Sequence, residues 1–273
     1  MSVTRESFEF VRKVLLERSA RSLEDEKVYL VETRLLPVAR RHGFQSVEDL
    51  VLHLRKRPTE TLMGELVQAM TINETFFFRD ASPFDVLRQN VLPDLMSRRA
   101  VSRCLNIWSA ACSSGQEAYS LAILLRHDFP ELASWNIRLI ASDLSTAMLE
   151  RARLGLYTEL EVSRGLPAAL RDSYFHRHEG GWRIRQDLRR MIEIRAINLS
   201  GAWPELPALD LVLLRNVLIY LGLPAKQWIL QQVRRVLQPD GYLLLGAAET
   251  TLNVSDEFVQ LPFDQASLFQ VTK

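Results

Sequence analysis

The sequence predicts an α/β protein: a mostly parallel sheet with a small antiparallel β insertion, preceded by a small all-helical domain. Three observations support this. Residues 1–70 carry only helical periodicity, with apolar residues spaced three and four apart. After residue 102, short apolar runs alternate with helical segments, as in a parallel sheet covered by helices on both faces. Two strand-like runs flank Gly180-Gly181, a pattern typical of a hairpin.

The first seventy residues are predicted to form several amphipathic helices. Two sets of apolar residues recur at helical spacing: Phe8, Val11, Val14 and Leu15, then Val28, Val31, Leu35 and Val38. Gly43 follows a basic turn and predicts the end of the second helix. Ser46 followed by Asp49 predicts the start of another. We therefore expect a helical domain over residues 1–70.

The remainder, residues 71–273, is predicted to hold a linker and the α/β domain. The expected strands are residues 104–111, 136–142, 191–199, 209–214 and 242–246, and the expected helices are 115–129, 146–154 and 224–237. The alternating run 267–272 predicts a final edge strand. The two runs around Gly180-Gly181 place the antiparallel insertion at about residues 173–195.

Composition excludes several classes of protein. The formal net charge of +1 gives no basic field for nucleic acid or a membrane surface. Cys104 and Cys112 do not form a disulfide framework, and neither has metal-ligand spacing. His176 and His178 lack a third ligand, so we expect surface residues and no metal. The apolar run 209–223 is too short and too charged to span a bilayer, and no secretory signal begins the chain. We expect a cytoplasmic protein.

Polar residues follow three of the predicted strands, where an open parallel sheet binds its ligands. Arg215 and Asn216 follow the fourth strand, and Ser113-Ser114-Gly115 follow the first and open a helix. Asp143 ends the second strand 28 residues after Gly115. That distance is typical of an acidic residue that binds ribose hydroxyls. Gly115 stands alone, so the turn is not a dinucleotide fingerprint. A nucleoside without phosphates, such as adenosylmethionine, would fit; a purely structural glycine is the open alternative.

The segment between the two domains, Asn73 to Arg79 (NETFFFR), is unusual because three phenylalanines in a row fit neither a strand nor an amphipathic helix. Two interpretations remain open. The segment is either a hydrophobic joint between the domains, or a linker whose polar residues face a cofactor while the rings anchor it.

Together these segments resemble the CheR family of chemotaxis receptor methyltransferases. The matching segments are residues 73–80 (NETFFFRD), 108–120 (WSAACSSGQEAYS), 141–144 (ASDL), 198–199 (NL), 215–220 (RNVLIY) and 239–241 (PDG). Each is weak evidence alone, but their order and spacing cover nearly the whole chain. The resemblance implies a Rossmann-like class I methyltransferase domain, S-adenosyl-L-methionine as cofactor and S-adenosyl-L-homocysteine as product. It also implies methyl esterification of glutamate side chains on the cytoplasmic helical bundle of chemoreceptors, and an enzyme associated with membrane-embedded receptor arrays.

The resemblance also implies which residues bind the cofactor. The expected contacts are Asn73, Thr75 and Arg79 from the linker, Glu117, Asp143 at the ribose, Asn198 and Leu199 at the adenine, and Arg215 and Asn216 at the methionine end. Gln116 and Ala118 depart from the glutamate and proline that relatives often carry, whereas Glu117 is retained. The insertion looks shorter than in relatives that grip a tethering peptide at the receptor's C-terminus, so we expect no dependence on such a tether.

The expected chemistry needs no general base, since a free glutamate titrates near ~4.3 and is already ionised. Arg79 is the group we expect to hold the substrate carboxylate, because a guanidinium presents two parallel donors to it. Tyr220 is expected to donate a further hydrogen bond or to pack beside the methyl path; a half-buried aromatic residue at a strand end is the alternative.

Substrate recognition is predicted on the second helix. Lys27, Arg34 and Arg41 recur at seven-residue spacing with Arg40 beside them, and in relatives the matching helix meets the receptor bundle. A solvated face is the alternative, and Pro37 blurs the helical register. We expect a monomer that does not insert into the membrane.

Two other functions remain possible. A methyltransferase acting on nucleic acid or a small molecule is disfavoured, because Arg215-Asn216-Val217-Leu218 stands where amino-group methylation of bases commonly uses an Asn/Asp-Pro-Pro-aromatic motif. A catalytically silent module that binds receptor or cofactor is the second alternative, although Arg79, Glu117, Asp143 and Asn216 are all retained.

Overall fold

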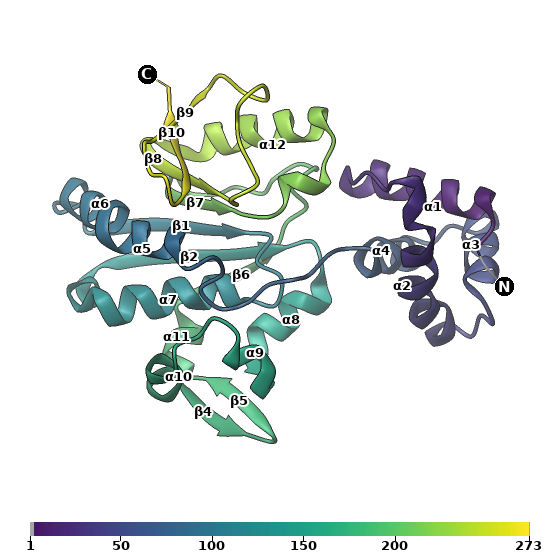
Figure 1. The fold of residues 1–273 in the computed structure, drawn as a ribbon, viewed down its shortest axis with the longest axis horizontal. Coiled ribbons are helices and arrows are strands. Elements are labelled where there is room, and N and C mark those ends of the chain that lie inside the picture. The colour runs from purple at the N-terminus through teal and green to yellow at the C-terminus, as the bar shows by residue number, and fades with distance from the viewer. Residues whose placement is uncertain (1–2, 273) are drawn as a thin grey trace. The chain divides into compact units, whose positions relative to one another are not determined.

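The computed structural model describes residues 3–272, which divide into two compact units (Figure 1). The first unit contains the chain up to Ile72 together with two short segments, Asn198–Ala202 and Tyr220–Ala225. The second unit contains everything else. The sequence indicated a boundary near residue 70, but no pattern predicted that two later segments return to the helical unit.

The first unit is helical in its described part. Its elements are α1 (Arg5–Ser19), the 3-10 turn η1 (Asp25–Lys27), α2 (Val28–Arg41), α3 (Val47–Lys56) and α4 (Glu60–Ala69). Ser46 starts α3 as predicted: its hydroxyl accepts the N–H of Asp49 at 3.1 Å. The helices share a core of residues with almost no solvent exposure, including Val11, Val31, Leu35, Leu50 and Leu54. The apolar residues that recur at helical spacing in the sequence therefore lie on the inward faces of these helices.

The second unit is built on a sheet whose strands run in the order β6-β2-β1-β7-β8-β10-β9. Their bounds are β1 (Cys104–Ala110), β2 (Asn136–Asp143), β6 (Ile192–Ala196), β7 (Leu209–Leu214), β8 (Leu237–Leu245), β9 (Phe258–Gln260) and β10 (Ser267–Val271). The first five in spatial order are parallel. Numbered within this sheet alone, they follow the doubly wound order 3-2-1-4-5, with the switch point between β1 and β7.

The expectation of a final edge strand is wrong. The strand β10 pairs antiparallel with both β8 and β9, so β9 is the edge. The sequence analysis did not predict β9, because a strand of three residues is too short to show an alternating pattern. β10 lies inside the sheet, and its Leu268 and Phe269 are both buried.

Helices cover the sheet on both faces, as predicted (Figure 1). They are α5 (Ser82–Val86), which continues through a π turn η2 (Leu87–Val91) into α6 (Leu92–Arg98), then α7 (Gln116–Asp128), η3 (Pro130–Ser134), α8 (Thr146–Leu154), η4 (Leu218–Tyr220) and α12 (Leu223–Val236). Every residue of β7 is buried, which explains why its sequence LDLVLL runs apolar without alternation.

A second sheet of three strands forms the insertion, in the order β3-β5-β4. Its elements are β3 (Leu156–Tyr157), α9 (Glu159–Ser163), α10 (Ala168–Tyr174), β4 (Phe175–His178), β5 (Gly181–Ile184) and α11 (Gln186–Arg190). The predicted hairpin is confirmed, since β4 and β5 pair antiparallel across a tight turn. The predicted range of about 173–195 is wrong at both ends. The two-residue β3 adds a strand upstream, and β6 belongs to the large sheet because it pairs with β2.

None of the helices described over residues 3–272 is long and apolar enough to cross a membrane.

Candidate active site

The loops that follow the parallel strands contain a concentration of strained backbone. Among the residues that are not glycine, five with positive φ lie in these loops or in the linker: Phe78, Asp80, Ala111, Ser113 and Asn216, at 48°, 61°, 54°, 51° and 59°. Such conformations are held only where the surrounding structure determines them, and they cluster at ligand and active sites. The carboxyl edge of the sheet is therefore the candidate site, as the sequence predicted.

Asp143 ends β2 and is almost fully buried, at 7% exposure. Its carboxylate accepts the N–H groups of Ser113 at 2.9 Å and Ser145 at 2.8 Å. The hydroxyl of Ser113 in turn donates to the backbone carbonyl of Asn73 at 2.9 Å. The predicted linker residue, the loop after β1 and the acidic end of β2 are thus joined by one chain of hydrogen bonds.

Gly115 is required at the start of α7. Its φ of +94° disfavours any side chain, and a Cβ there would lie 2.9 Å from the Cβ of Ala152 on α8. The close approach lets the loop after β1 turn sharply into the first turn of α7. The side chain of Glu117, in that turn, accepts a hydrogen bond from the Ser109 hydroxyl at 2.8 Å.

Arg215 lies directly after β7 and is the centre of a charged network. Its side chain is 1% exposed and donates to Glu117 at 3.1 Å and to Asp80 at 3.0 Å. It also donates to the carbonyl of Arg79 at 2.8 Å. The strand end, the helix start and the linker are therefore held together by one guanidinium, at the switch point of the sheet.

Arg79 lies in the linker with its guanidinium 5.5 Å from the ring of Phe76, and its Nη1 donates to the carbonyl of Glu74 at 2.9 Å. Within residues 3–272, five buried side-chain nitrogen atoms have no hydrogen-bond partner, and the Nε atoms of Arg79 and Arg215 are two of them. A buried donor left unpaired is costly. Two such donors near the strand ends suit a ligand that carries carboxylate groups.

The three phenylalanines of the linker have different surroundings. Phe77 is fully buried and packs edge-on against Tyr157 and Phe175 of the small sheet, whereas Phe78 packs on Phe84. The ring of Phe76 lies under the guanidinium of Arg164 at 4.1 Å. Phe77 therefore anchors the linker in the core of the second unit. This favours the interpretation in which the rings hold the polar residues in place.

Glu249 is a site residue that the sequence analysis missed. Its carboxylate, 6% exposed, accepts the N–H groups of Asn216 and Val217 at 2.7 and 2.8 Å, and those of Gly246 and Ile219 at 2.7 and 3.3 Å. It fixes the loop after β7 from the end of β8. Its signal in the sequence was an acidic residue among small residues just after a predicted strand.

Three predicted site residues belong to the first unit. The segment 198–202 carries Asn198 and Leu199, and the segment 220–225 carries Tyr220. The amide of Asn198 donates to the carbonyl of Arg18 at 2.8 Å and accepts from Ser200. The remaining predicted site residues, apart from those of α2, lie in the second unit, where Thr75 is partly buried.

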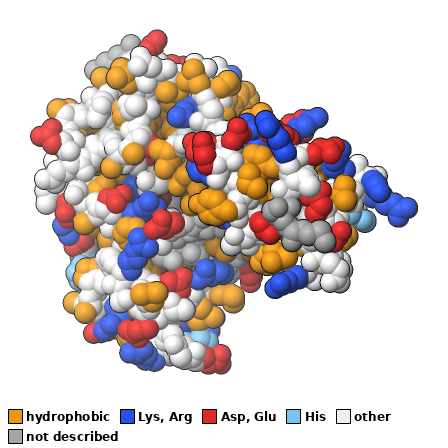
Figure 2. Space-filling model, turned by 45° about the vertical axis from the view of Figure 1, so that its right-hand side comes forward, with side chains coloured by type: hydrophobic (Ala, Val, Ile, Leu, Met, Phe, Trp, Pro, Cys, Tyr) orange, Lys and Arg blue, Asp and Glu red, His pale blue; other side chains and the backbone are white. Residues whose placement is uncertain are grey.

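The predicted recognition residues of α2 differ in their surroundings. Arg34 is partly buried and donates to the carbonyls of Met70 and Thr71 at the end of α4. Lys27 pairs with Glu24 and Arg41 with Glu65, while Arg40 is exposed and pairs with no carboxylate of residues 3–272. On the face that Figure 2 shows, basic and acidic side chains are interspersed.

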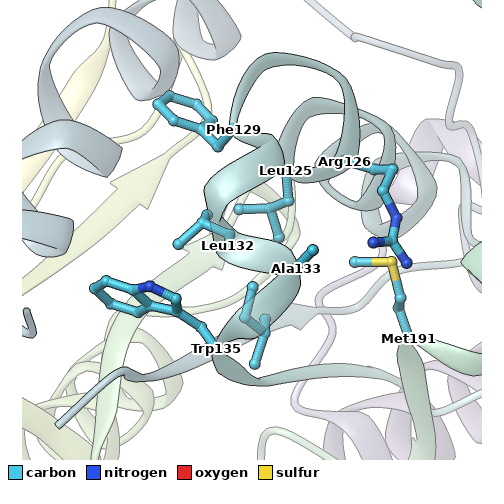
Figure 3. A pocket seen from close by; sticks show the side chains of 8 residues that line it. Leu125, Arg126, Phe129, Leu132, Ala133, Trp135 and Met191 are labelled. Carbon is cyan, nitrogen blue, oxygen red and sulfur yellow. The ribbon is translucent and has the colours of Figure 1, made fainter.

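Two of the cavities formed by residues 3–272 lie at opposite ends of the sheet. A cavity of about 660 Å³ borders the carboxyl edge and is lined by Asp80, Leu245, Ala247 and the loop between β9 and β10. A smaller apolar cavity of about 140 Å³ lies beside Trp135 and Met191, at the amino ends of β2 and β6 (Figure 3). This smaller cavity lies at the opposite edge of the sheet from the candidate active site, and none of the predicted site residues lines it.

The Cys112 thiol is buried near two carboxylates of the site. Burial raises the pKa of the Cys112 thiol well above its ordinary value, and the nearby Asp143 and Glu117 raise it further. The thiol therefore stays protonated. Residues 3–272 contain no group of three or more His, Cys, Asp or Glu side chains placed to hold a metal ion.

Comparison with known proteins identifies the chain first as a methyltransferase that uses S-adenosylmethionine. Residues 73–266 match the family model described as "CheR methyltransferase, SAM binding domain", and residues 6–71 match "CheR methyltransferase, all-alpha domain". The chain belongs to the CheR methyltransferase family.

Curated relatives match this chain over most of their lengths. The chain is 38% identical to Chemotaxis protein methyltransferase 1 of Pseudomonas aeruginosa over 94% of this chain and 95% of that protein. It is 34% identical to Chemotaxis protein methyltransferase Cher2 of Pseudomonas putida over 99% of both. It is 36% identical to Chemotaxis protein methyltransferase 1 of Vibrio cholerae over 86% of both. These relatives give no support to a catalytically silent module.

The residues present fit S-adenosylmethionine. A buried carboxylate, Asp143, ends β2, and Gly115 lies after β1 at the start of α7. The unpaired Nε atoms of Arg79 and Arg215 are donors suited to a carboxylate. No phosphate cradle of three glycines is present in this turn, as expected for a nucleoside cofactor without phosphates.

Proposed function

We propose that this enzyme transfers a methyl group to glutamate side-chain carboxylates of methyl-accepting chemotaxis proteins, forming methyl esters for sensory adaptation. One observation carries the proposal. Arg79, at the carboxyl edge, keeps a buried Nε donor that has no partner within residues 3–272; Arg215 keeps one as well, which we assign to the carboxylate of the cofactor's methionine end. Arginine is the side chain best suited to bind carboxylates, since its planar fork matches their two oxygens.

Each predicted cofactor residue has a proposed role. Asp143 holds the ribose hydroxyls, and Asn198 and Leu199 flank the adenine. Glu117, Arg215 and Asn216 hold the methionine end. Asn73, Thr75 and Arg79 close over the cofactor from the linker. The hydrogen bonds that join Asn73 to Ser113 and Ser113 to Asp143 support a shared task for linker and strand end.

The cofactor supplies a methyl group on a sulfonium, which a carboxylate oxygen can displace in line. Glutamate is ionised at neutral pH because its ordinary pKa is about 4.3, so the protein need not remove a proton. Its contribution is alignment and exclusion of water, and good alignment lowers a barrier by several kcal/mol. The buried network around Arg215 provides a rigid base for that alignment.

Arg79 orients the substrate carboxylate, and Tyr220 donates a hydrogen bond or packs beside the methyl path. Arg79 should not bind the carboxylate too strongly. The carboxylate loses its charge as the ester forms, so a very tight ion pair would stabilise the substrate more than the transition state. The existing bond from Arg79 to the carbonyl of Glu74 limits the freedom of its guanidinium.

The helical unit is proposed to recognise the helical bundle of the receptor, with the enzyme acting as a monomer at the receptor array. Three cations are proposed to meet acidic receptor helices: exposed Arg40, and Lys27 and Arg41, whose present partners are Glu24 and Glu65. Arg34 has a structural task at the end of α4, so any recognition role for it remains a prediction. Charge reversal at Lys27 and Arg40 is therefore the cleaner test of this surface.

Independence from a receptor tether is part of the proposal. The edge strand β4 has four residues and its hairpin turn is tight, so the small sheet offers a short edge for an added peptide. A receptor fragment that lacks its C-terminal tail should be methylated as fast as one that carries it. A marked loss on removing the tail would contradict this part alone.

One assay tests the main proposal. The enzyme is incubated with methyl-labelled S-adenosylmethionine and a receptor cytoplasmic fragment, and the product is treated with alkali. Release of volatile labelled methanol identifies a carboxyl ester. Alkali-stable label would indicate another acceptor, and no label would indicate a silent module.

A second experiment tests the recognition surface. The double variant Lys27→Glu/Arg40→Glu should lower the rate of receptor methylation while its affinity for the cofactor stays unchanged. Lys56→Glu on α3 is the matched control.

A further inference from the structure

The segment that follows α1 contacts both loops of the first unit that carry predicted site residues. Ser19 ends α1, and Ala20 turns the chain through a left-handed conformation with φ of 53°. The carbonyl of Arg18 accepts the side-chain amide of Asn198 at 2.8 Å. On the other side, Arg21 pairs with Leu221 in an isolated antiparallel bridge. Residues 18–22 therefore hold two loops of the unit at once.

The contact with Tyr220 involves both main chain and side chain. The N–H of Ser22 donates to the carbonyl of Tyr220 at 3.4 Å. The guanidinium of Arg21 lies 5.1 Å from the centroid of the Tyr220 ring. A planar guanidinium stacks on an aromatic face and is attracted to it, so it restrains the torsion angles of the tyrosine side chain. The side-chain contact is therefore with the ring of Tyr220.

We propose that Arg21 is a positioning residue for methyl transfer: it fixes the Tyr220 ring, and the bridge to Leu221 fixes its backbone. The inference rests on the proposed function, in which Tyr220 lies beside the methyl path.

The first test is a double-mutant cycle. Arg21→Ala should lower kcat for receptor methylation by about three- to tenfold, the range of a lost cation–π contact, with little change in cofactor affinity or thermal stability. Tyr220→Phe should lower kcat as well. The kcat of the double variant should equal that of Tyr220→Phe to within about twofold, because the two residues act through one contact. Arg21→Lys should keep a kcat between those of the wild type and Arg21→Ala, since lysine keeps the positive charge but lacks the planar guanidinium.

Arg12→Ala is the matched control. Arg12 lies over the ring of Phe8 at 5.8 Å in the same unit, so its loss removes a contact of the same kind away from Tyr220. It should leave kcat unchanged. Additive losses from Arg21→Ala and Tyr220→Phe would overturn the inference, as would an unchanged kcat in Arg21→Ala while Tyr220→Phe is impaired.

A second measurement needs no turnover and separates the inference from the proposed function. The chain has six tyrosines, so the ring signals of tyrosine-labelled enzyme can be resolved by NMR, and Tyr220→Phe identifies the signal of Tyr220. Arg21→Ala should shift or broaden that signal, while Arg12→Ala should not. An unmoved signal would overturn the positioning role. A moved signal together with a fully active Tyr220→Phe would support the positioning and remove Tyr220 from the proposed mechanism.

Discussion

Two arginines bridge pairs of carboxylates at opposite ends of the same strand, and their surroundings differ. Arg215 follows the last residue of β7 and joins Glu117 to Asp80. Arg99 lies at the other end, where it joins Asp210, near the start of β7, to Asp240 on β8. Both sites use the same chemistry on the same sheet. Only the Arg215 site lies at the edge where parallel sheets bind ligands.

The difference lies in how completely each arginine is satisfied. The Nε of Arg99 donates to Asp210 at 2.7 Å, and its two Nη atoms donate to Asp240 at 2.9 and 2.6 Å. Arg215 keeps a buried Nε without a partner, and positive-φ residues Asp80 and Asn216 lie beside it. A saturated network stabilises the fold. A network with unpaired donors and strained backbone indicates a site that a ligand completes.

The largest expected effect is on stability at the Arg99 end. Arg99→Met leaves the carboxylate of Asp210, which is 3% exposed, without its cation. Removing one partner of a buried pair costs about 3–5 kcal/mol of unfolding free energy. Urea unfolding should show this loss, while cofactor affinity at the other end stays the same. The double variant Arg99→Met/Asp210→Asn should recover part of the loss; no recovery would mean that the pair is not the cause.

The next effect is on turnover at the carboxyl edge. Arg79→Ala should lower kcat about a hundredfold, because a misaligned carboxylate loses most of the benefit of orientation. Affinity for S-adenosylmethionine, measured by calorimetry, should change far less. Arg164→Ala is the matched control, since Arg164 stacks on the same Phe76 ring and pairs with Glu74. Equal losses of turnover and cofactor affinity in Arg79→Ala would contradict an orienting role.

A smaller effect is expected where Glu249 holds the loop after β7. Glu249→Gln replaces one acceptor oxygen by an amide that points donors at backbone N–H groups. Hydrogen bonds to a charged group contribute about 2 kcal/mol, so the loop should open more readily by about that amount. Hydrogen exchange of the peptide covering residues 215–220 should become faster, while β1 keeps its protection. Unchanged exchange would mean that the sheet alone orders this loop.

The sequence predicted the residues that lie at strand ends and missed those that act through tertiary contacts. Gly115 and Asp143 were found because strand, turn and acid follow one another along the chain. Glu249 was missed because three of its four N–H partners lie 30 to 33 residues earlier, in the loop after β7. The structural use of Arg34 was hidden for the same reason, since its acceptors are carbonyls 36 and 37 residues away.

The smallest expected effect is a pH dependence at the Arg99 end. Hydrogen bonding to Arg99, together with its charge, holds the pKa of Asp240 below its usual range despite partial burial. The unfolded chain, with an ordinary Asp pKa of about 3.9, therefore takes up the proton first as the pH falls. The stability that ionised Asp240 contributes is complete above that value and is lost as pH falls through the lower, folded-state pKa.

Asp240→Asn should thus reduce the unfolding free energy at pH 6 and lose that disadvantage in acid, so the two stability curves converge at low pH. Because the Asp240 side chain is 40% exposed, solvent screens the pair and the gap at pH 6 should be small. Cofactor affinity at pH 6 should be the same in both proteins, since the other end of the sheet keeps its own network. A gap that persists in acid would assign the loss to the changed hydrogen bonding of the side chain, whereas a change in cofactor affinity would show that the two ends of β7 are coupled.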